Sequence, residues 1–175
     1  MKSVYMTALC PEKGADGDLK RYQISCTEDF GWHSPLPLMV PLALWSASFP
    51  RDRVNSAELK TLPPLKLTGP VLKEDNIILQ MKDRKEFENS VMFREIHGKN
   101  IPPQEKVSFI NWEGLLLQPG RIEAAGQFQA KNQQIEKIFQ FPSWQLGLYK
   151  LRYDETRNWW EDLSLTSLWK VRKPS

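Results

Sequence analysis

The strand-like segment near the end of this 175-residue chain carries apolar side chains on both of its faces. Successive side chains of a β-strand point to opposite faces of the sheet. Within residues 144–153, one face holds Trp144, Leu146 and Leu148, and the other holds Tyr149, Leu151 and Tyr153. The strand must therefore be covered on both faces by its own chain, or one aromatic row is exposed and meets a partner.

Short alternating segments separated by turn sequences recur along the chain and predict further strands. A first hairpin is predicted from 3–10 and 19–27, across the turn sequence PEKGADGD, with Tyr22, Ile24 and Cys26 on one face. Further strands are predicted at 65–70, 76–82, 106–112 and 121–130, and a final hairpin from 143–153 and 163–171. A capping-box sequence predicts a short helix near 56–62, and 135–139 is read as one helical turn, whereas 85–97 fits helix or strand.

These elements predict a mainly β fold, α+β at the margin: an antiparallel sheet or a sandwich of hairpins with one to three short helices. The length suits a single domain spanning 1–175. The 13 prolines are expected in loops and at strand ends. An apolar, proline-rich extended segment is predicted at 30–50, with one short helical turn within 42–48, and short proline-rich connections are predicted at 61–70 and 98–106.

The N-terminus and the cysteines predict an intracellular, cytoplasmic protein without a signal peptide. The apolar run before Cys10 is short and interrupted by polar residues, so it is read as a strand. Cys10 and Cys26 cannot form the disulfide framework of a secreted protein and are expected to be free thiols. The segment 30–50 contains no Asp, Glu, Lys or Arg, but its interior prolines exclude a transmembrane helix.

No catalytic, metal-binding or cofactor-binding motif is found in the sequence. His33 and His97 lack a metal-type partner at helical spacing, and a zinc site with the two cysteines would match no ligand knuckle. Neither phosphate-loop signature occurs. We therefore predict a protein that is not an enzyme and that carries no cofactor; a metal-dependent nuclease using Asp52, Glu58 and Lys60 is the most remote alternative.

Aromatic and basic residues alternate in the last thirty residues and suggest a contact surface. The predicted contact residues are Trp159, Trp160, Tyr149, Tyr153, Lys150, Arg152, Arg157, Trp169, Arg172 and Lys173, with Trp45 and Trp32 from the apolar segment. Tryptophan and arginine are frequent hot spots of protein interfaces. We predict a non-enzymatic interaction or assembly protein, self-associating and matrix- or scaffold-like, that docks through this hairpin and the apolar segment.

Two other partners also suit rings flanked by cations. Single-stranded nucleic acid or a nucleoprotein would stack bases on the rings, and a peripheral membrane contact would place tryptophan among the headgroups. The interspersed acidic residues, among them Glu161 and Asp162, disfavour phosphate and favour a protein partner. Nucleic-acid binding is therefore kept as the alternative.

Trp159 and Trp160 are adjacent, so a strand would send their side chains to opposite faces. Two neighbouring charges at Glu161 and Asp162 suggest a bulge, which would turn Trp160 inward and Trp159 outward. Without that bulge the assignment reverses. In both cases one ring of the pair is expected to contact a partner.

Overall fold

The structure is a computed structural model that describes residues 2–31, 36–45, 54, 56–73, 76–91, 93–94, 113–119, 136–154, 156 and 163–173. Its elements in chain order are β1 (Lys2–Pro11), α1 (Gly17–Phe30), β2 (Val40–Trp45), α2 (Ser56–Thr61), β3 (Leu65–Lys73), β4 (Asn76–Met81), α3 (Arg84–Asn89), β5 (Gly114–Gln118), β6 (Lys137–Phe141), β7 (Trp144–Tyr153) and β8 (Ser164–Lys173). The predicted strands 106–112 and 121–130 and the connection 98–106 lie outside the described residues.

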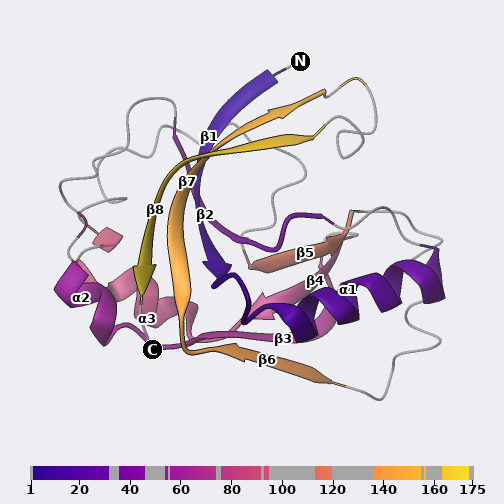
Figure 1. Ribbon diagram of the computed structural model, residues 1–175, viewed down its shortest axis with the longest axis horizontal. Coiled ribbons are helices and arrows are strands. Elements are labelled where there is room, and N and C mark those ends of the chain that lie inside the picture. The colour runs from indigo at the N-terminus through magenta and orange to yellow at the C-terminus, as the bar shows by residue number, and fades with distance from the viewer. Residues whose placement is uncertain are drawn as a thin grey trace.

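The described strands form two antiparallel sheets, as the mainly β prediction requires (Figure 1). The first sheet has the order β2-β1-β7-β8 and the second β5-β4-β3-β6. The predicted strands at 3–10, 65–70 and 76–82, the helix near 56–62 and the final hairpin are confirmed. Of the predicted connection 61–70, only the residues before Leu65 link elements, because β3 begins there. Of the ambiguous segment 85–97, residues 85–89 belong to the helix α3, whereas 92 and 95–97 lie outside the described residues.

The predicted first hairpin is wrong, because residues 17–30 form the helix α1. Its buried residues Leu19, Gln23 and Cys26 recur at helical spacing, and the alternation of Tyr22, Ile24 and Cys26 is incidental. Asp16 stands at the N-cap, and the helix ends at Gly31, whose φ of 62° is the left-handed conformation that favours glycine. The strand β1 instead pairs with β2 and β7.

The helical turn predicted at 135–139 is also wrong, because 137–141 form the edge strand β6. Here tertiary contacts decide the backbone: β6 pairs with β3, and Phe139 packs on Tyr22 of α1 with ring centroids 5.5 Å apart. In the apolar segment, 40–45 form the strand β2 in place of the predicted helical turn.

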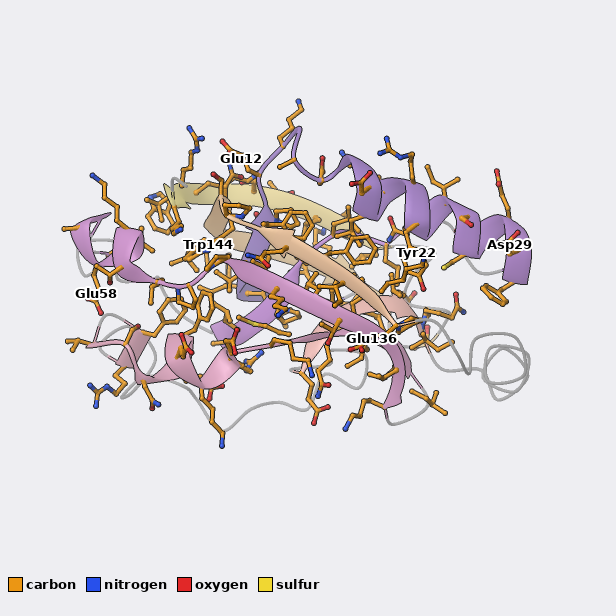
Figure 2. All side chains as sticks on the ribbon, turned by 90° about the horizontal axis from the view of Figure 1, so that it is seen from below. Glu12, Tyr22, Asp29, Glu58, Glu136 and Trp144 are labelled. Atoms are coloured by element: carbon orange, nitrogen blue, oxygen red, sulfur yellow. The ribbon has the colours of Figure 1, made fainter. Side chains whose placement is uncertain are left out.

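The main core lies between the two sheets and α1, and Trp144 is its largest side chain (Figure 2). Trp144 has 0% of its surface exposed. Its ring centroid lies 5.5 Å from that of Phe87, and its indole N–H donates to the Pro63 carbonyl oxygen at 3.0 Å. This side chain thereby joins β7 to α3 and to the turn before β3.

A second, smaller core covers the opposite face of the first sheet. It contains Met6, Ala8, Met39, Tyr149, Leu151 and Tyr153. The strand β7 is therefore covered on both faces by its own chain, which settles the alternative that its sequence leaves open. In β8 the register with β7 shifts at Leu168, so that Leu165 packs on the second core and Trp169 on the main one. Unbroken alternation would place Leu163, Leu165 and Trp169 on one face, but a one-residue bulge exchanges the faces.

Candidate functional site

Many of the predicted contact residues cannot be placed. Trp32, Arg157, Trp159 and Trp160 lie outside the described residues, as does the bulge predicted at Glu161 and Asp162. Trp45 ends the strand β2, and only its backbone is described. The predicted orientation of the tryptophan pair therefore stays a prediction.

Three of the predicted contact residues are buried within the chain. Tyr149 and Tyr153 expose 3% and 1% of their surface, because both rings belong to the second core. Lys173 exposes 6%, and its amine donates to the Pro142 carbonyl oxygen at 2.9 Å. These three side chains are unavailable to a partner in this fold, which corrects their assignment as surface contacts.

Much of the described part of the apolar segment is buried as well. Val40 and Ala43 are buried in the main core, and β2 is paired with β1 along its length. Residues 36–39 pack beside them, with Leu36 and Met39 buried. In the described part of the segment, β2 is therefore covered mainly by the chain itself, and residues 36–39 line a pocket.

The other basic residues of the final hairpin lie at the surface. Arg152 is exposed, and Lys150 is half-buried with its amine 6.0 Å from the ring centroid of Tyr5. Arg172 pairs with Glu12 of the turn after β1, Nε to Oε1 2.6 Å. Trp169 is half-buried against the main core. Within the described part of the chain, the predicted aromatic row therefore belongs largely to the core, whereas Arg152, Arg172 and the half-buried Lys150 lie at the surface.

The strand β8 forms one end of the first sheet, and most of its side chains are exposed. No described strand pairs with its outer edge. The unpaired N–H and C=O groups of an edge strand can pair with another chain. The bulged residue Leu168 exposes 42% of its surface on this strand.

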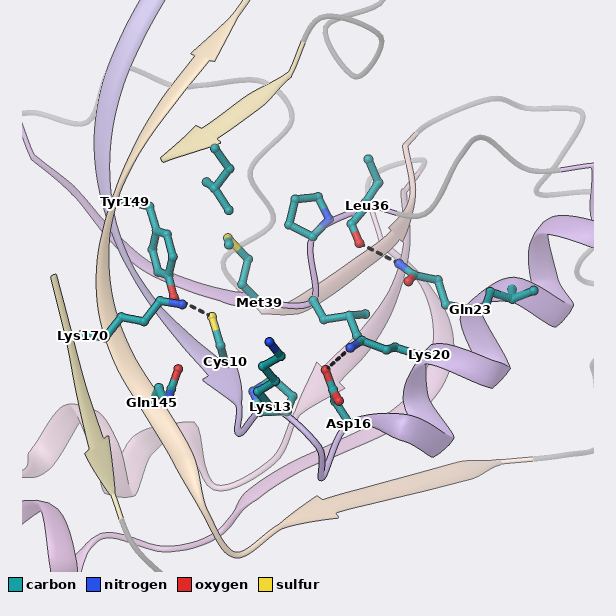
Figure 3. A pocket seen from close by; sticks show the side chains of 15 residues that line it. Cys10, Lys13, Asp16, Lys20, Gln23, Leu36, Met39, Gln145, Tyr149 and Lys170 are labelled. Carbon is teal, nitrogen blue, oxygen red and sulfur yellow. Dashed lines mark hydrogen bonds and ion pairs between the residues drawn. The ribbon is translucent and has the colours of Figure 1, made fainter. Parts of the chain in front are cut away.

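A pocket of about 550 Å³ opens on the face of the β7–β8 hairpin that carries Tyr149 and Leu165. It lies between β1, α1, residues 36–39, β7 and β8 (Figure 3). The side chains of Lys13, Lys20 and Lys170 reach it from three different elements. Asp16 forms an ion pair with Lys20, with 2.8 Å between Oδ2 and Nζ. Gln23 is buried, and its amide donates to the Leu36 carbonyl oxygen at 2.8 Å, which joins α1 to the opposite wall.

Cys10 and Tyr149 form one wall of this pocket. The thiol sulfur and the phenol oxygen are hydrogen-bonded at 3.1 Å. The ring of Tyr149 lies over Gly147, since a Cβ at that position would stand 2.6 Å from Cε2 of the ring. The amine of Lys170 lies 5.7 Å from the centroid of the same ring. A glycine in mid-strand is therefore what allows the tyrosine to reach Cys10.

Burial keeps this wall uncharged. Burial raises the pKa of the Cys10 thiol, and the Tyr149 hydrogen bond and the Lys170 charge offset only part of that rise. Burial and the neighbouring Cys10 raise the pKa of Tyr149. A protonated thiol is a poorer nucleophile than a thiolate, so the raised pKa lowers the reactivity of Cys10. Cys26 and Tyr22 repeat this arrangement. Burial raises the pKa of the Cys26 thiol, and the Tyr22 hydrogen bond offsets only part of that rise. Burial and the neighbouring Cys26 raise the pKa of Tyr22.

We expect these four groups to make the protein sensitive to alkali. The unfolded chain releases their protons near the ordinary values, about 8.5 for cysteine and about 10 for tyrosine, whereas the folded chain retains them to higher pH. The free energy of unfolding should therefore fall between about pH 8 and pH 10.5. Urea unfolding across this range measures it.

In the same titration, the free energy of unfolding of Tyr149→Phe should decline less steeply with pH, because this variant lacks one of the four titrating groups. Leu168→Ala removes no titratable group and should keep the wild-type slope. A free energy of unfolding that stays level over this pH range would contradict the assignment of these pKa shifts.

In the part of the chain that the structure describes, no three His, Cys, Asp or Glu side chains are grouped to hold a metal ion. None of its described helices is long and apolar enough to cross a bilayer. The sequence matches no protein-family model, and comparison with curated proteins gives no match. The pocket itself was not anticipated from the sequence; the only signals for it were the basic residues Lys13 and Lys170, which are far apart along the chain.

Proposed function

We propose that this protein is a non-enzymatic assembly protein that associates with a second copy of itself by strand addition at the outer edge of β8. The observation that carries this proposal is the ten-residue strand β8 at the end of its sheet, with no described strand on its outer side. Main-chain hydrogen bonds to such an edge supply affinity without a deep groove.

The first half of β8 is the part suited to pairing. Residues 164–168 carry no charge, whereas Lys170, Arg172 and Lys173 occupy the second half. Lysine on an edge strand opposes the addition of a further strand. The helix α2 contacts β8 and lies near its C-terminal end in Figure 1, which further separates the two halves.

The charge order along the sequence favours a second copy of the chain as the added strand. Glu161 and Asp162 precede β8, and the basic residues follow its neutral half. In an antiparallel pairing centred on Thr166, the acidic end of one copy comes beside the basic end of the other. Opposite charges across strands stabilise the pair, whereas like charges that face each other destabilise it.

A charge exchange at Thr166 tests the proposal. Thr166→Lys and Thr166→Glu should each weaken self-association, because the two-fold axis sets like charges opposite each other at about 0.2–1 kcal/mol per pair. An equimolar mixture of both variants should associate more tightly than either alone. Sedimentation velocity over a concentration series measures all three.

Asn89→Lys is the control for Thr166→Lys. It adds the same positive charge at an exposed position of α3, away from the outer edge of β8, and should leave self-association at the wild-type level. A wild-type protein that stays monomeric at the highest concentration would overturn the proposal. So would a mixture of the two variants that associates no better than each variant alone.

The nucleic-acid alternative has less support from the described residues. Stacking on single strands needs exposed rings, and Tyr149 and Tyr153 are buried. Binding of a single-stranded oligonucleotide that weakens steeply with salt, through release of counterions, would restore that alternative.

A further inference from the structure

The pocket beside the hairpin has predominantly apolar walls. Its apolar lining comprises Pro11, Ile24, Leu36, Pro37, Leu38, Met39 and Leu165. Ile24 exposes 48% of its surface although it lies on an otherwise polar face of α1. A volume of about 550 Å³ lies within the range of small-molecule sites, which are mainly apolar with a few placed polar groups. These walls suit an aliphatic chain better than a flat polar ring.

The charged groups of the pocket are mostly cations. Three lysines line it, and Asp16 is the sole carboxylate among its lining residues and is engaged by Lys20. Lys13 makes no ion pair within the described residues, and Lys170 lies over the ring of Tyr149 without a carboxylate partner there. Two amines therefore remain unneutralised at one pocket, which favours an anionic group between them.

The wall between these two amines is neutral and fixed. The Cys10 thiol and the Tyr149 hydroxyl satisfy each other at 3.1 Å, so neither places a charge against an incoming anion. Figure 3 shows Lys170, Tyr149 and Cys10 along one wall of the pocket and Leu36, Gln23 and Lys20 along the facing wall, with Lys13 and Met39 between them. The pocket thus combines two amines that have no carboxylate partner among the described residues with a mainly apolar lining.

From the two free amines and the apolar lining we infer that the pocket binds a small amphipathic anion, namely an aliphatic chain that ends in a carboxylate or a phosphate. The amines of Lys13 and Lys170 hold the head, and Ile24, Leu36 and Met39 contact the chain. The inference does not depend on self-association through β8, and either can fail without the other.

Calorimetric titration of the full chain with a matched series of amphiphiles tests the chemistry. Dodecanoate and dodecyl phosphate should bind. The affinity for dodecanol should be at least about tenfold lower, and dodecylamine should not bind, because only the anions pair with the lysine amines. From octanoate to dodecanoate, affinity should rise about fourfold per buried methylene. The relative affinities of dodecanoate and dodecyl phosphate decide between a fatty-acid head and a phosphate head.

Alkylation of Cys10, followed by mass spectrometry, places the ligand in this pocket. Bound dodecanoate should slow modification of Cys10, which is half-buried here, and should leave the buried Cys26 on α1 as it was. The double variant Lys13→Met with Lys170→Met should lose about tenfold or more in affinity for dodecanoate. Lys85→Met, at an exposed position of α3, should bind as the wild type does.

Equal affinity for dodecanol and dodecanoate would overturn the inference, as would failure of all the amphiphiles to bind. Tight binding that leaves Cys10 alkylation unchanged would place the ligand elsewhere and would overturn it too. Circular dichroism and thermal unfolding show whether the double variant is folded. If it is not, Ile24→Gln provides the second variant at a half-exposed wall position and should weaken dodecanoate binding.

Discussion

Replacing Trp144 with alanine is expected to lower the free energy of unfolding by about 3–5 kcal/mol, the usual range for removal of a buried large aromatic ring. The side chain is fully buried between the two sheets and contacts Phe87 of α3. The cavity would open where β7, α3 and the turn before β3 meet, and a stable strand framework surrounds it, so collapse would recover little. Urea unfolding followed by circular dichroism measures the loss.

Trp144→Phe separates packing from hydrogen bonding at this site. It keeps most of the apolar contact but removes the donor to the Pro63 carbonyl, a loss of about 1 kcal/mol. Leu168→Ala, at an exposed position of β8, should cost less than about 0.5 kcal/mol. Similar losses from Trp144→Ala and Leu168→Ala would show that Trp144 does not hold the core together.

Replacing Gly114 with alanine is expected to separate β5 from β4. A Cβ at this position would lie 2.0 Å from the carbonyl oxygen of Leu79 and 2.9 Å from the Cα of Gln80. Both are backbone atoms of the neighbouring strand and cannot rotate away as a side chain would. The cost should reach or exceed the upper end of the ~1–3 kcal/mol range for overpacking. Thermal unfolding measures it, and hydrogen exchange of the β4 amides reports the separation.

Gly17 supplies the matched control for this glycine. It lies in the first turn of α1, where a Cβ would meet only the end of the Arg21 side chain at 3.7 Å. Gly17→Ala should be neutral or stabilise the protein by up to about 1 kcal/mol, because alanine is the better helix former. If Gly114→Ala were equally harmless, the close approach of β5 and β4 would be excluded.

Several features of the fold follow from the sequence alone. The alternation within 3–10, 65–70, 76–82 and the final hairpin is a local signal. A strand sends alternate side chains to opposite faces whichever elements pack against it. The helix α2 follows its capping sequence and stops before Pro63 and Pro64. Cys10 and Cys26 were predicted to be free thiols, and both are free in the structure.

Signals for α1 were also present in the sequence but were outweighed. Asp16 and Gly31 bracket the helix as cap residues, and Leu19, Gln23 and Cys26 have helical spacing. Because Gln23 is polar, the buried stripe is concealed, and its burial depends on a hydrogen bond to the Leu36 carbonyl, a residue outside the helix. A polar residue is placed inside a protein only when such a partner exists, and the partner is a tertiary fact.

Only the tertiary structure decided which aromatic residues are surface and which are core. The period of two in β7 gives two faces but does not say what covers each, and a second core supplied by β1 and Met39 buries Tyr149 and Tyr153. The bulge at Leu168 changes faces within β8 without any local signal. The pocket needs Cys10, Lys13 and Lys170 together, and pairing of β1 with β7 and of β7 with β8 brings them to one place. Contacts between residues so distant in sequence depend on strand order, which a local pattern does not specify.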